Sequence, residues 1–309
     1  MQKRASIPFY LITGFLGSGK TTLLTHILNE YSSKRRIAVI QNEFAPSGTD
    51  GKNLKLTGLD FHLEEINNGS VFCVCLLSGF LQTIEKIIQK HDPEMIFLEA
   101  SGMSDPINIL ELLQGKQFKG RLYPGKIISV ADAVNFEKGM AKFPGFRHQL
   151  MVADIIILNK IDIVQHPVSI VRDKVKKINP FAEIIETSWC QFNIRAIIDQ
   201  SIPESRPAAQ FPHQQPGPRP EVSVCVLRTH QKISLHSMEL FLKNLSQITI
   251  RAKGHVNLTD NTIRGMQSVF DNWELKEIHA YTGPTEIIAF SEKLSPAELK
   301  KLFLNYALS

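Results

Sequence analysis

The sequence has little charge imbalance, few cysteines and no long apolar run. The formal net charge is only +5, and the densest basic groups, at 32–36 and 172–177, suit solvated helix faces or strand entries better than a nucleic-acid patch. No stretch approaches the roughly eighteen apolar residues that a membrane-spanning helix needs. We therefore expect neither nucleic acid nor a membrane as a partner.

The sequence has only four cysteines. Residues 1–17 start with basic residues and continue with an apolar run, which imitates an export signal. Because that run leads directly into a glycine-rich loop, we interpret it as the first strand. The expected compartment is therefore the cytoplasm, where cysteines are thiols or metal ligands.

Short apolar runs alternate with amphipathic stretches over the first 200 residues. The runs are continuous, as in strands buried on both faces, so the pattern predicts a doubly wound α/β domain with a mostly parallel sheet. The predicted strands are 9–14, 36–43, 94–101, 126–133, 154–162 and 182–188, and the clearest predicted helices are 21–31, 81–91 and 168–179.

Proline is concentrated in residues 201–221, which predicts an extended linker between a domain at 1–200 and a second one at 222–309. The second part reads as a small α+β module. Its expected strands are 222–229, 249–258, 273–282 and 285–291, and its expected helices are 234–247 and 295–308, the last with a serine cap.

Residues 14–22, GFLGSGKTT, match the phosphate-loop spacing with Gly14, Gly19, Lys20 and Thr21. The segment follows a predicted strand and opens a predicted helix, which is the context that the motif requires. Glycines let backbone N–H groups point at phosphate oxygens, and the helix N-terminus adds partial positive charge. Lys20 would bridge the β- and γ-phosphates, and the Thr21 hydroxyl would ligate Mg²⁺.

Residues 157–162, ILNKID, end a predicted strand with Asn159, Lys160 and Asp162. The Asp162 carboxylate would accept hydrogen bonds from the N1–H and exocyclic amine of guanine, which adenine does not offer in that arrangement. The Lys160 stem would lie across the base, and Asn159 would tie this segment to the phosphate loop. A backbone N–H near Ser188 would meet guanine O6, although a plain turn serine explains that residue nearly as well.

Two further segments are candidate switch elements. Glu99 ends the strand 94–101 and is followed by Gly102, so the carboxylate would hold Mg²⁺ directly or through water, and the glycine N–H would sense the γ-phosphate. The segment 41–50 is rich in turn residues and carries Glu43 and Asp50 as possible Mg²⁺ or water contacts. An ordinary polar loop accounts for 41–50 equally well.

The order GFLGSGKTT, QNEF…GTD, NNGS…C, EASG, SVADAVNF, NKID and RAKG resembles the CobW-like P-loop GTPases, which are related to UreG, HypB and MeaB. This resemblance implies GTP and Mg²⁺ as cofactors, with Lys20, Glu99 and Asp50 as catalytic residues and Thr21 and Glu99 as Mg²⁺ ligands. The nucleotide-binding residues expected in full are Gly14, Gly17, Ser18, Gly19, Lys20, Thr21, Thr22, Gly102, Asn159, Lys160, Asp162 and Ser188.

The family's metal motif is C-x-C-C directly after an Asn-Gly pair, and this chain departs from it. Ser70 and Phe72 stand at two of the three cysteine positions, which leaves Cys73 and, two residues further, Cys75. Two thiolates would still bind Zn²⁺ or another transition metal with ligands from a partner or a second copy. If the segment is a strand, both thiols face the same side and would equally suit a core.

The resemblance implies a slow, Mg²⁺-dependent GTPase that delivers metals or supports metallocofactor assembly. Its expected partners are GTP, a client metalloenzyme or corrinoid protein and, as one option, a second copy of the chain. Three alternatives remain: a corrinoid-enzyme accessory GTPase that binds no metal itself, a P-loop small-molecule kinase, and a nucleotide-binding scaffold without turnover. The C-terminal module carries no catalytic signature and is expected to bind partners or cover a site.

Overall fold

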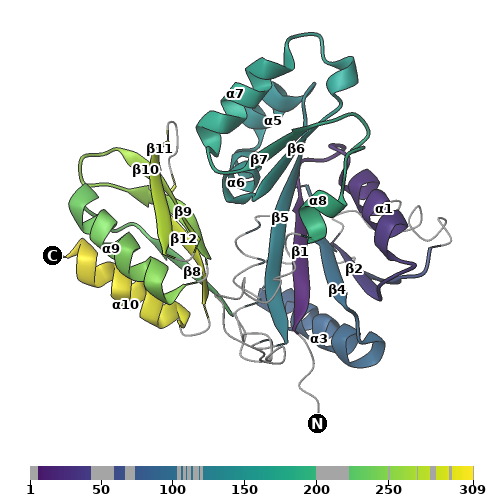
Figure 1. Ribbon diagram of the computed structural model, residues 1–309, viewed down its shortest axis with the longest axis horizontal. Helices are drawn as coiled ribbons and strands as arrows, with labels where there is room; N and C mark the ends of the chain where they lie inside the picture. The colour runs from purple at the N-terminus through teal and green to yellow at the C-terminus, as the bar shows by residue number, and fades with distance from the viewer. Residues whose placement is uncertain are drawn as a thin grey trace, which may run out of the picture.

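The computed structural model describes residues 6–42, 59–66, 74–102, 106, 109, 113, 118, 121–199, 223–249, 251–269, 271–278, 283–291 and 294–308. These residues form two sheets, each with its own helices (Figure 1). The predicted linker lies outside the described residues. The domain boundaries 1–200, 201–221 and 222–309 therefore stay a prediction.

Seven strands of the described residues form the first sheet, in the order β3-β2-β4-β1-β5-β6-β7, and every pairing between them is parallel. This confirms the predicted doubly wound architecture. The strands are β1 (Ile7–Thr13), β2 (Ile37–Asn42), β3 (His62–Ile66), β4 (Met95–Glu99), β5 (Leu122–Asp132), β6 (Ile155–Asn159) and β7 (Glu183–Glu186).

Helices cover both faces of this sheet (Figure 1). They are α1 (Lys20–Tyr31), α3 (Val74–His91), α5 (Phe136–Lys142), α6 (Pro144–Val152), α7 (Val168–Ile178) and α8 (Arg195–Ile198), and a short 3₁₀ turn, η2 (Ile161–Ile163), follows β6. Helices α5 and α6 were not predicted, because Gly139, Pro144 and Gly145 interrupt their pattern.

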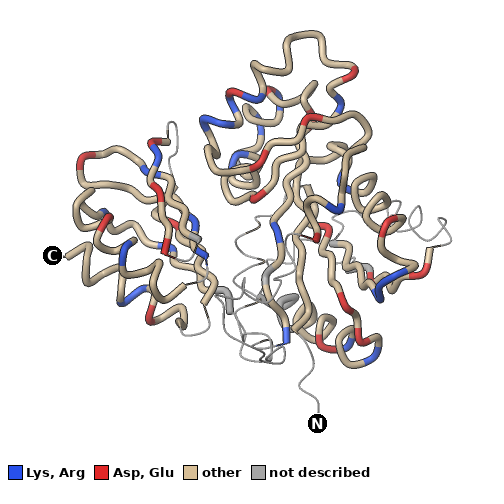
Figure 2. Tube along the Cα trace, in the orientation of Figure 1, with Lys and Arg blue, Asp and Glu red and all other residues tan. Residues whose placement is uncertain are grey.

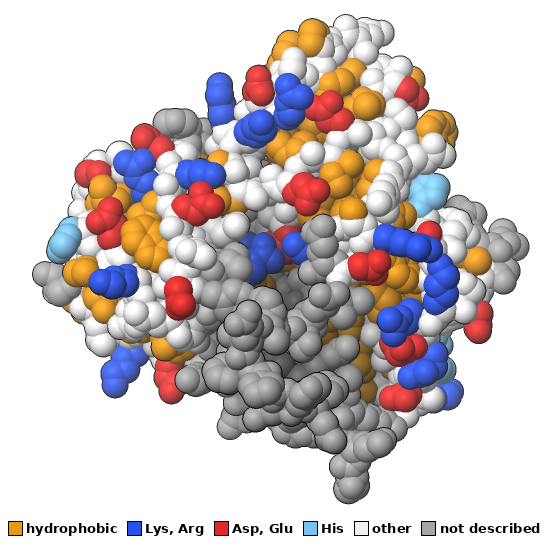
Figure 3. All heavy atoms as spheres, in the orientation of Figure 1, with side chains coloured by type: hydrophobic (Ala, Val, Ile, Leu, Met, Phe, Trp, Pro, Cys, Tyr) orange, Lys and Arg blue, Asp and Glu red, His pale blue; other side chains and the backbone are white. Residues whose placement is uncertain are grey.

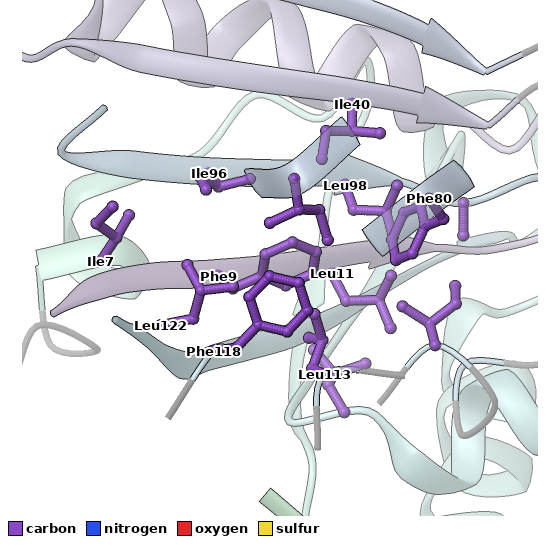
Figure 4. Close-up of a cluster of buried hydrophobic side chains, with 14 of the residues drawn as sticks. Ile7, Phe9, Leu11, Ile40, Phe80, Ile96, Leu98, Leu113, Phe118 and Leu122 are labelled. Atoms are coloured by element: carbon purple, nitrogen blue, oxygen red, sulfur yellow. The ribbon is translucent and has the colours of Figure 1, made fainter. Parts of the chain in front are cut away.

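The central strand β1 explains why the predicted strands are continuous apolar runs. Its side chains alternate between the two faces of the sheet. Phe9 and Leu11 join the cluster that contains Phe80 of α3 (Figure 4), whereas Tyr10 and Ile12 join the cluster formed with α1 and α8. Because both faces are buried, every position of the strand favours an apolar residue.

The second sheet is antiparallel, with the order β11-β10-β9-β12-β8 among the described residues. Its strands are β8 (Ser223–Thr229), β9 (Arg251–Asn257), β10 (Ile263–Val269), β11 (Asn272–Glu277) and β12 (Thr285–Ser291), and its helices are α9 (Leu235–Ile248) and α10 (Pro296–Ala307). Ser234 and Ser295 cap the helices, and Ser295 forms a capping box with Glu298. The α+β class of this module is confirmed, although strand β10 was missed and the strand expected at 273–282 ends at Glu277.

The two sheets share a buried contact. Val226, Ile288 and Phe290 of the second sheet belong to the same hydrophobic cluster as Phe9 and Leu98 of the first. The helices α9 and α10 lie on the side of the second sheet that faces away from the first (Figure 1). The opposite side of the second sheet is therefore the one that packs against the first sheet.

A buried ionic cluster accompanies this apolar contact. Asp154, directly before β6, has a side chain that is 1% exposed and forms ion pairs with Arg251 and Lys253 of β9. Its other oxygen accepts a hydrogen bond of 2.8 Å from the backbone N–H of Ile127. The RAKG segment at 251–254, which carried part of the family resemblance, therefore forms part of the contact between the two sheets.

The described surface is mixed in charge. Acidic and basic residues are interspersed along both parts of the chain (Figure 2), and the face shown in Figure 3 alternates between them in the same way. Among the described helices, none combines the length and the hydropathy that crossing a bilayer requires.

Candidate functional site

The loop between β1 and α1 has a backbone that requires glycine at two positions. Gly14 has φ of +136°, and a β-carbon there would lie 2.2 Å from the carbonyl oxygen of Val130. Gly19 has φ of +112°, and its β-carbon would lie 2.4 Å from Nδ2 of Asn159. The loop can therefore pack against β5 and β6 only where no side chain is present.

Lys20 begins α1 and is 8% exposed. Its ammonium donates hydrogen bonds to the carbonyl oxygens of Gly14 at 3.0 Å and Phe15 at 3.2 Å, so it lies over the loop. The Ser18 hydroxyl is buried without a hydrogen-bond partner among the described residues. An ammonium, an unpaired hydroxyl and a helix N-terminus suit a phosphate-bearing ligand.

Thr21 and Glu99, which come from different elements, are in direct contact. The Thr21 hydroxyl donates to one carboxylate oxygen of Glu99 at 2.8 Å, and the side-chain amide of Gln41 donates to the other at 2.7 Å. A hydroxyl and a carboxylate are the hard oxygen donors that Mg²⁺ prefers. The residues present therefore fit the magnesium ion that the sequence predicts.

Gly102 lies against the phosphate loop. A β-carbon at this position would be 2.7 Å from the backbone nitrogen of Leu16. The carbonyl oxygen of Gly102 accepts a hydrogen bond of 3.1 Å from the buried side chain of Gln149 on α6. Helix α6 therefore contacts the segment that follows Glu99.

Asn159, the last residue of β6, forms hydrogen bonds with the phosphate loop and with the segment after β7. Its amide donates to the carbonyl oxygen of Ser18 at 2.8 Å, and its carbonyl oxygen accepts from the backbone N–H of Cys190 at 3.0 Å. The Cys190 thiol lies 3.5 Å from the carbonyl oxygen of Gly19. Burial raises the pKa of this thiol to about 12, so it stays protonated and packs as a small apolar group.

Lys160 is held by a carboxylate at the end of the neighbouring strand. Its ammonium lies 2.7 Å from Oδ2 of Asp132, whose side chain is 9% exposed. Burial alone would raise the pKa of Asp132, but hydrogen bonds from Lys160 and Asn135 hold it below its ordinary value. Asp132 is therefore ionised at neutral pH.

The remaining base-recognition candidates lie next to this pair. Asp162 is exposed in η2, and Ser188 is half-buried after β7. Trp189 is 68% exposed, while its carbonyl oxygen lies 2.9 Å from Nε2 of His26 on α1. The structure thus brings the phosphate loop, η2 and the segment after β7 to one edge of the sheet.

Several predicted residues lie outside the described part of the chain. These include Asp50 and Cys73. Cys75 is placed only as part of α3, which begins at Val74, and this corrects the strand considered for Cys75. Among the described residues, no three His, Cys, Asp or Glu side chains are grouped to hold a metal ion.

Four site residues were missed in the sequence. Asp132 is the last residue of β5, and Gln41 is the last but one of β2. In a parallel α/β sheet, ligands bind at the carboxyl ends of the strands, so these positions could have indicated both residues. Cys190 and Gln149 gave no signal, because their contacts with Asn159 and Gly102 depend on chain segments far away in sequence.

The parallel sheet, the glycine loop before α1 and the polar residues after β4 and β6 together define a P-loop nucleotide-binding domain. The family model described as CobW/HypB/UreG, nucleotide-binding domain, matches residues 8–186, more than half of the chain. The chain belongs to this family.

Curated relatives agree with the family. The chain is 31% identical over 191 residues to a Pseudomonas aeruginosa protein named zinc chaperone CobW, which covers 52% of this chain and 51% of that protein. It is 34% identical over 155 residues to the Escherichia coli zinc chaperone YeiR, covering 49% of this chain and 46% of that protein. The chain therefore spans about half the length of these relatives.

A solved structure extends the similarity of fold beyond the nucleotide-binding domain. The Zn(II)-bound YjiA GTPase from E. coli aligns with a TM-score of 0.52 and 20% identity, covering 98% of this chain and 99% of that one. At this identity the alignment establishes the fold alone, including the arrangement of a parallel sheet followed by a smaller module.

Proposed function

We propose that the chain is a Mg²⁺-dependent GTP-binding protein that hydrolyses GTP slowly and uses its nucleotide state to engage a client metalloprotein. The observation that carries the proposal is the side chain of Asn159. It connects the phosphate loop at Ser18 with the segment after β7 at Cys190, and it starts the Asn-Lys-x-Asp segment. One residue thus connects the proposed phosphate-binding segment with the proposed base-binding segment.

The phosphates would lie along the backbone of residues 14–20, at the N-terminus of α1. The Lys20 ammonium, which bonds to loop carbonyls in this structure, would turn to the β- and γ-phosphates and offset their charge. Thr21 and Glu99 would hold Mg²⁺, directly or through water, and bound Mg²⁺ would supply charge neutralisation. The roles of Asp50 and Gly102 as switch residues remain part of the proposal.

Base choice is the most direct test. Calorimetry with Mg²⁺ should show that the protein prefers GTP to ATP. Because xanthine carries a carbonyl where guanine carries its exocyclic amine, Asp162→Asn should weaken GTP binding about 10- to 100-fold and improve binding of xanthosine triphosphate. Equal affinity of the wild-type protein for GTP and ATP would refute the proposal.

Turnover separates a GTPase from a binding scaffold and needs its own measurement. Under single-turnover conditions the wild-type protein should convert GTP to GDP and phosphate. Lys20→Ala should abolish this conversion, because the ammonium that offsets the transferring phosphoryl charge is removed. A wild-type protein that binds GTP without any hydrolysis would reduce the proposal to a nucleotide-binding scaffold.

We propose zinc as the cargo, since the relatives above are named zinc chaperones. The candidate ligands are Cys73 and Cys75, with the remaining ligands from a client or a second copy, because two thiolates do not complete a tetrahedral site. Zinc titration with and without GTP should give a lower stoichiometry for Cys73→Ser/Cys75→Ser than for the wild type. Equal stoichiometry would exclude Cys73 and Cys75 as zinc ligands. No zinc binding by either protein would leave the alternative of an accessory GTPase for a corrinoid enzyme that binds no metal itself.

A further inference from the structure

Asp132 has no role in the function proposed above, yet it lies beside the base-recognition segment. It is the last residue of β5, and the pairing of β5 with β6 places it opposite Asn159. The strand register therefore sets a buried carboxylate next to the residue that precedes Lys160.

The Asp132 carboxylate is fixed on both oxygens. Oδ1 accepts hydrogen bonds from the backbone N–H groups of Val134 at 2.9 Å and Asn135 at 3.1 Å. Oδ2 accepts from the side-chain amide of Asn135 at 2.9 Å and from the Lys160 ammonium at 2.7 Å. A group held at four points is a rigid anchor for the one long, flexible side chain among its partners.

Lys160 needs such an anchor. Its backbone lies in the left-handed region, with φ of 66° and ψ of 33°, and its side chain is 33% exposed. Free lysine side chains sample many rotamers, and a ligand that must order one loses affinity. With the ammonium bound to Asp132, the stem is ordered before any base arrives.

We propose that Asp132 is a positioning residue for guanine recognition, which holds the Lys160 ammonium so that the lysine stem is preformed as a platform for the base. This inference rests on the proposed function, because it assumes that the 159–162 segment receives guanine. The competing explanation is that Asp132 only caps the turn at 134–135.

The test compares GTP and ATP affinities of the wild type and Asp132→Asn by calorimetry with Mg²⁺. Asparagine keeps the shape and one acceptor oxygen for the turn, but its NH₂ group cannot accept from Lys160. GTP affinity should fall about 3- to 10-fold, as expected when a ligand must order one long side chain, with the weaker ATP affinity unchanged. The preference for GTP should therefore shrink by that factor.

Two further variants separate positioning from turn stability. Asn135→Ala removes a partner of Asp132 without touching the lysine contact, so it should lower thermal stability and leave the GTP preference intact. Asp132→Glu keeps the charge but displaces it by one methylene, so it should lose part of the preference for GTP. This variant replaces Asp132→Asn in the test if the asparagine variant does not fold.

The outcomes also separate this inference from the proposed function. Full GTP preference in both Asp132 variants overturns the inference and leaves the proposed function standing. A wild-type protein without preference for GTP overturns both.

Discussion

Two glycines of the loop between β1 and α1 differ in their surroundings, and this difference predicts different substitution costs. Gly19→Ala places a β-carbon 2.4 Å from the side-chain nitrogen of Asn159 in a backbone with φ of +112°. We expect a loss of about 3 kcal/mol or more in the free energy of unfolding. Backbone strain at Gly19 and the loss of hydrogen bonds from a displaced Asn159 both contribute to it. Urea unfolding measures it.

Gly17→Ala is the matched control. Its φ is +70°, but no atom lies within 4 Å of the added β-carbon. Only the left-handed backbone penalty applies, so the loss should be about 1 kcal/mol. Equal losses for the two variants would show that the contact with Asn159 is not the reason why position 19 requires glycine.

At the residue scale, the sequence predicted which side chains meet at the candidate site, but it did not predict all of their hydrogen-bond and ion-pair partners. Lys20, Thr21 and Glu99 were predicted together, because a phosphate loop and a following acidic strand end occur at the same edge of a parallel sheet. The ion pair of Lys160 with Asp132 was not, because it depends on the register between two strands.

Helix α6 links the candidate site to the second sheet through two adjacent residues. Gln149, which is buried, donates to the carbonyl oxygen of Gly102. His148 lies 2.6 Å from a carboxylate oxygen of Glu286 on β12, and Arg228 binds the other oxygen at 2.8 Å. The helix therefore contacts both the segment after Glu99 and the C-terminal module.

Gln149→Leu keeps the volume of the side chain but leaves the Gly102 carbonyl without this donor. We expect a loss of about 1–3 kcal/mol in the free energy of unfolding, the penalty of an unmet buried polar group. We also expect weaker discrimination between GTP and GDP, because Gly102 would no longer be held against Leu16.

Lys142→Gln, on the exposed end of α5, controls for general effects in this region and should change stability by less than about 0.5 kcal/mol. Chemical unfolding and calorimetry with both nucleotides measure the two effects. Unchanged values for Gln149→Leu would show that this contact does not position Gly102.

Strands buried on both faces were predictable from their continuous apolar runs, whereas two strands without a clear pattern were missed. The runs at 9–14 and 154–162 are continuous because β1 and β6 lie inside the sheet. Strand β3 (His62–Ile66) is an edge strand with polar residues, and β10 (Ile263–Val269) contains Gly265, so neither shows a clear period. Helix α3 begins at Val74, seven residues before the predicted start at 81, because the apolar residues become regularly spaced only after its first turns.

For the whole molecule, the ion cluster at Asp154 predicts a stability that depends on pH. Burial alone would raise the pKa of Asp154, but the charges of Arg251 and Lys253 hold it well below its ordinary value of 3.8. A carboxyl with a lowered folded-state pKa contributes stability above its unfolded-state pKa. That contribution is lost as the pH falls through the folded-state pKa.

Asp154→Asn should therefore lose about 3–5 kcal/mol near pH 7, because two cations stay buried without their counter-charge. The difference from the wild type should shrink as the pH is lowered below 3.8, because the unfolded wild-type chain then takes up a proton at Asp154 while the folded state keeps this carboxylate charged down to a lower pH. Urea unfolding of both proteins across this range measures it.

Glu137→Gln is the matched control, because it breaks an ion pair with Lys174 whose side chains are 60% and 47% exposed. Its loss should stay below about 1 kcal/mol at every pH. A pH-independent difference for Asp154→Asn would show that Asp154 is not the charged partner of Arg251 and Lys253.

The hydrophobic cluster shared by the two sheets restricts the motions open to a nucleotide-driven switch. Val226, Ile288 and Phe290 pack with Phe9 and Leu98, so a hinge that swung the second sheet away would expose apolar surface on both sides to water. Sliding by a fraction of a side chain keeps that surface covered. Under the proposed function, any signal that passes from GTP to a client through this module should therefore travel as a small shear, too slight to change the hydrodynamic radius.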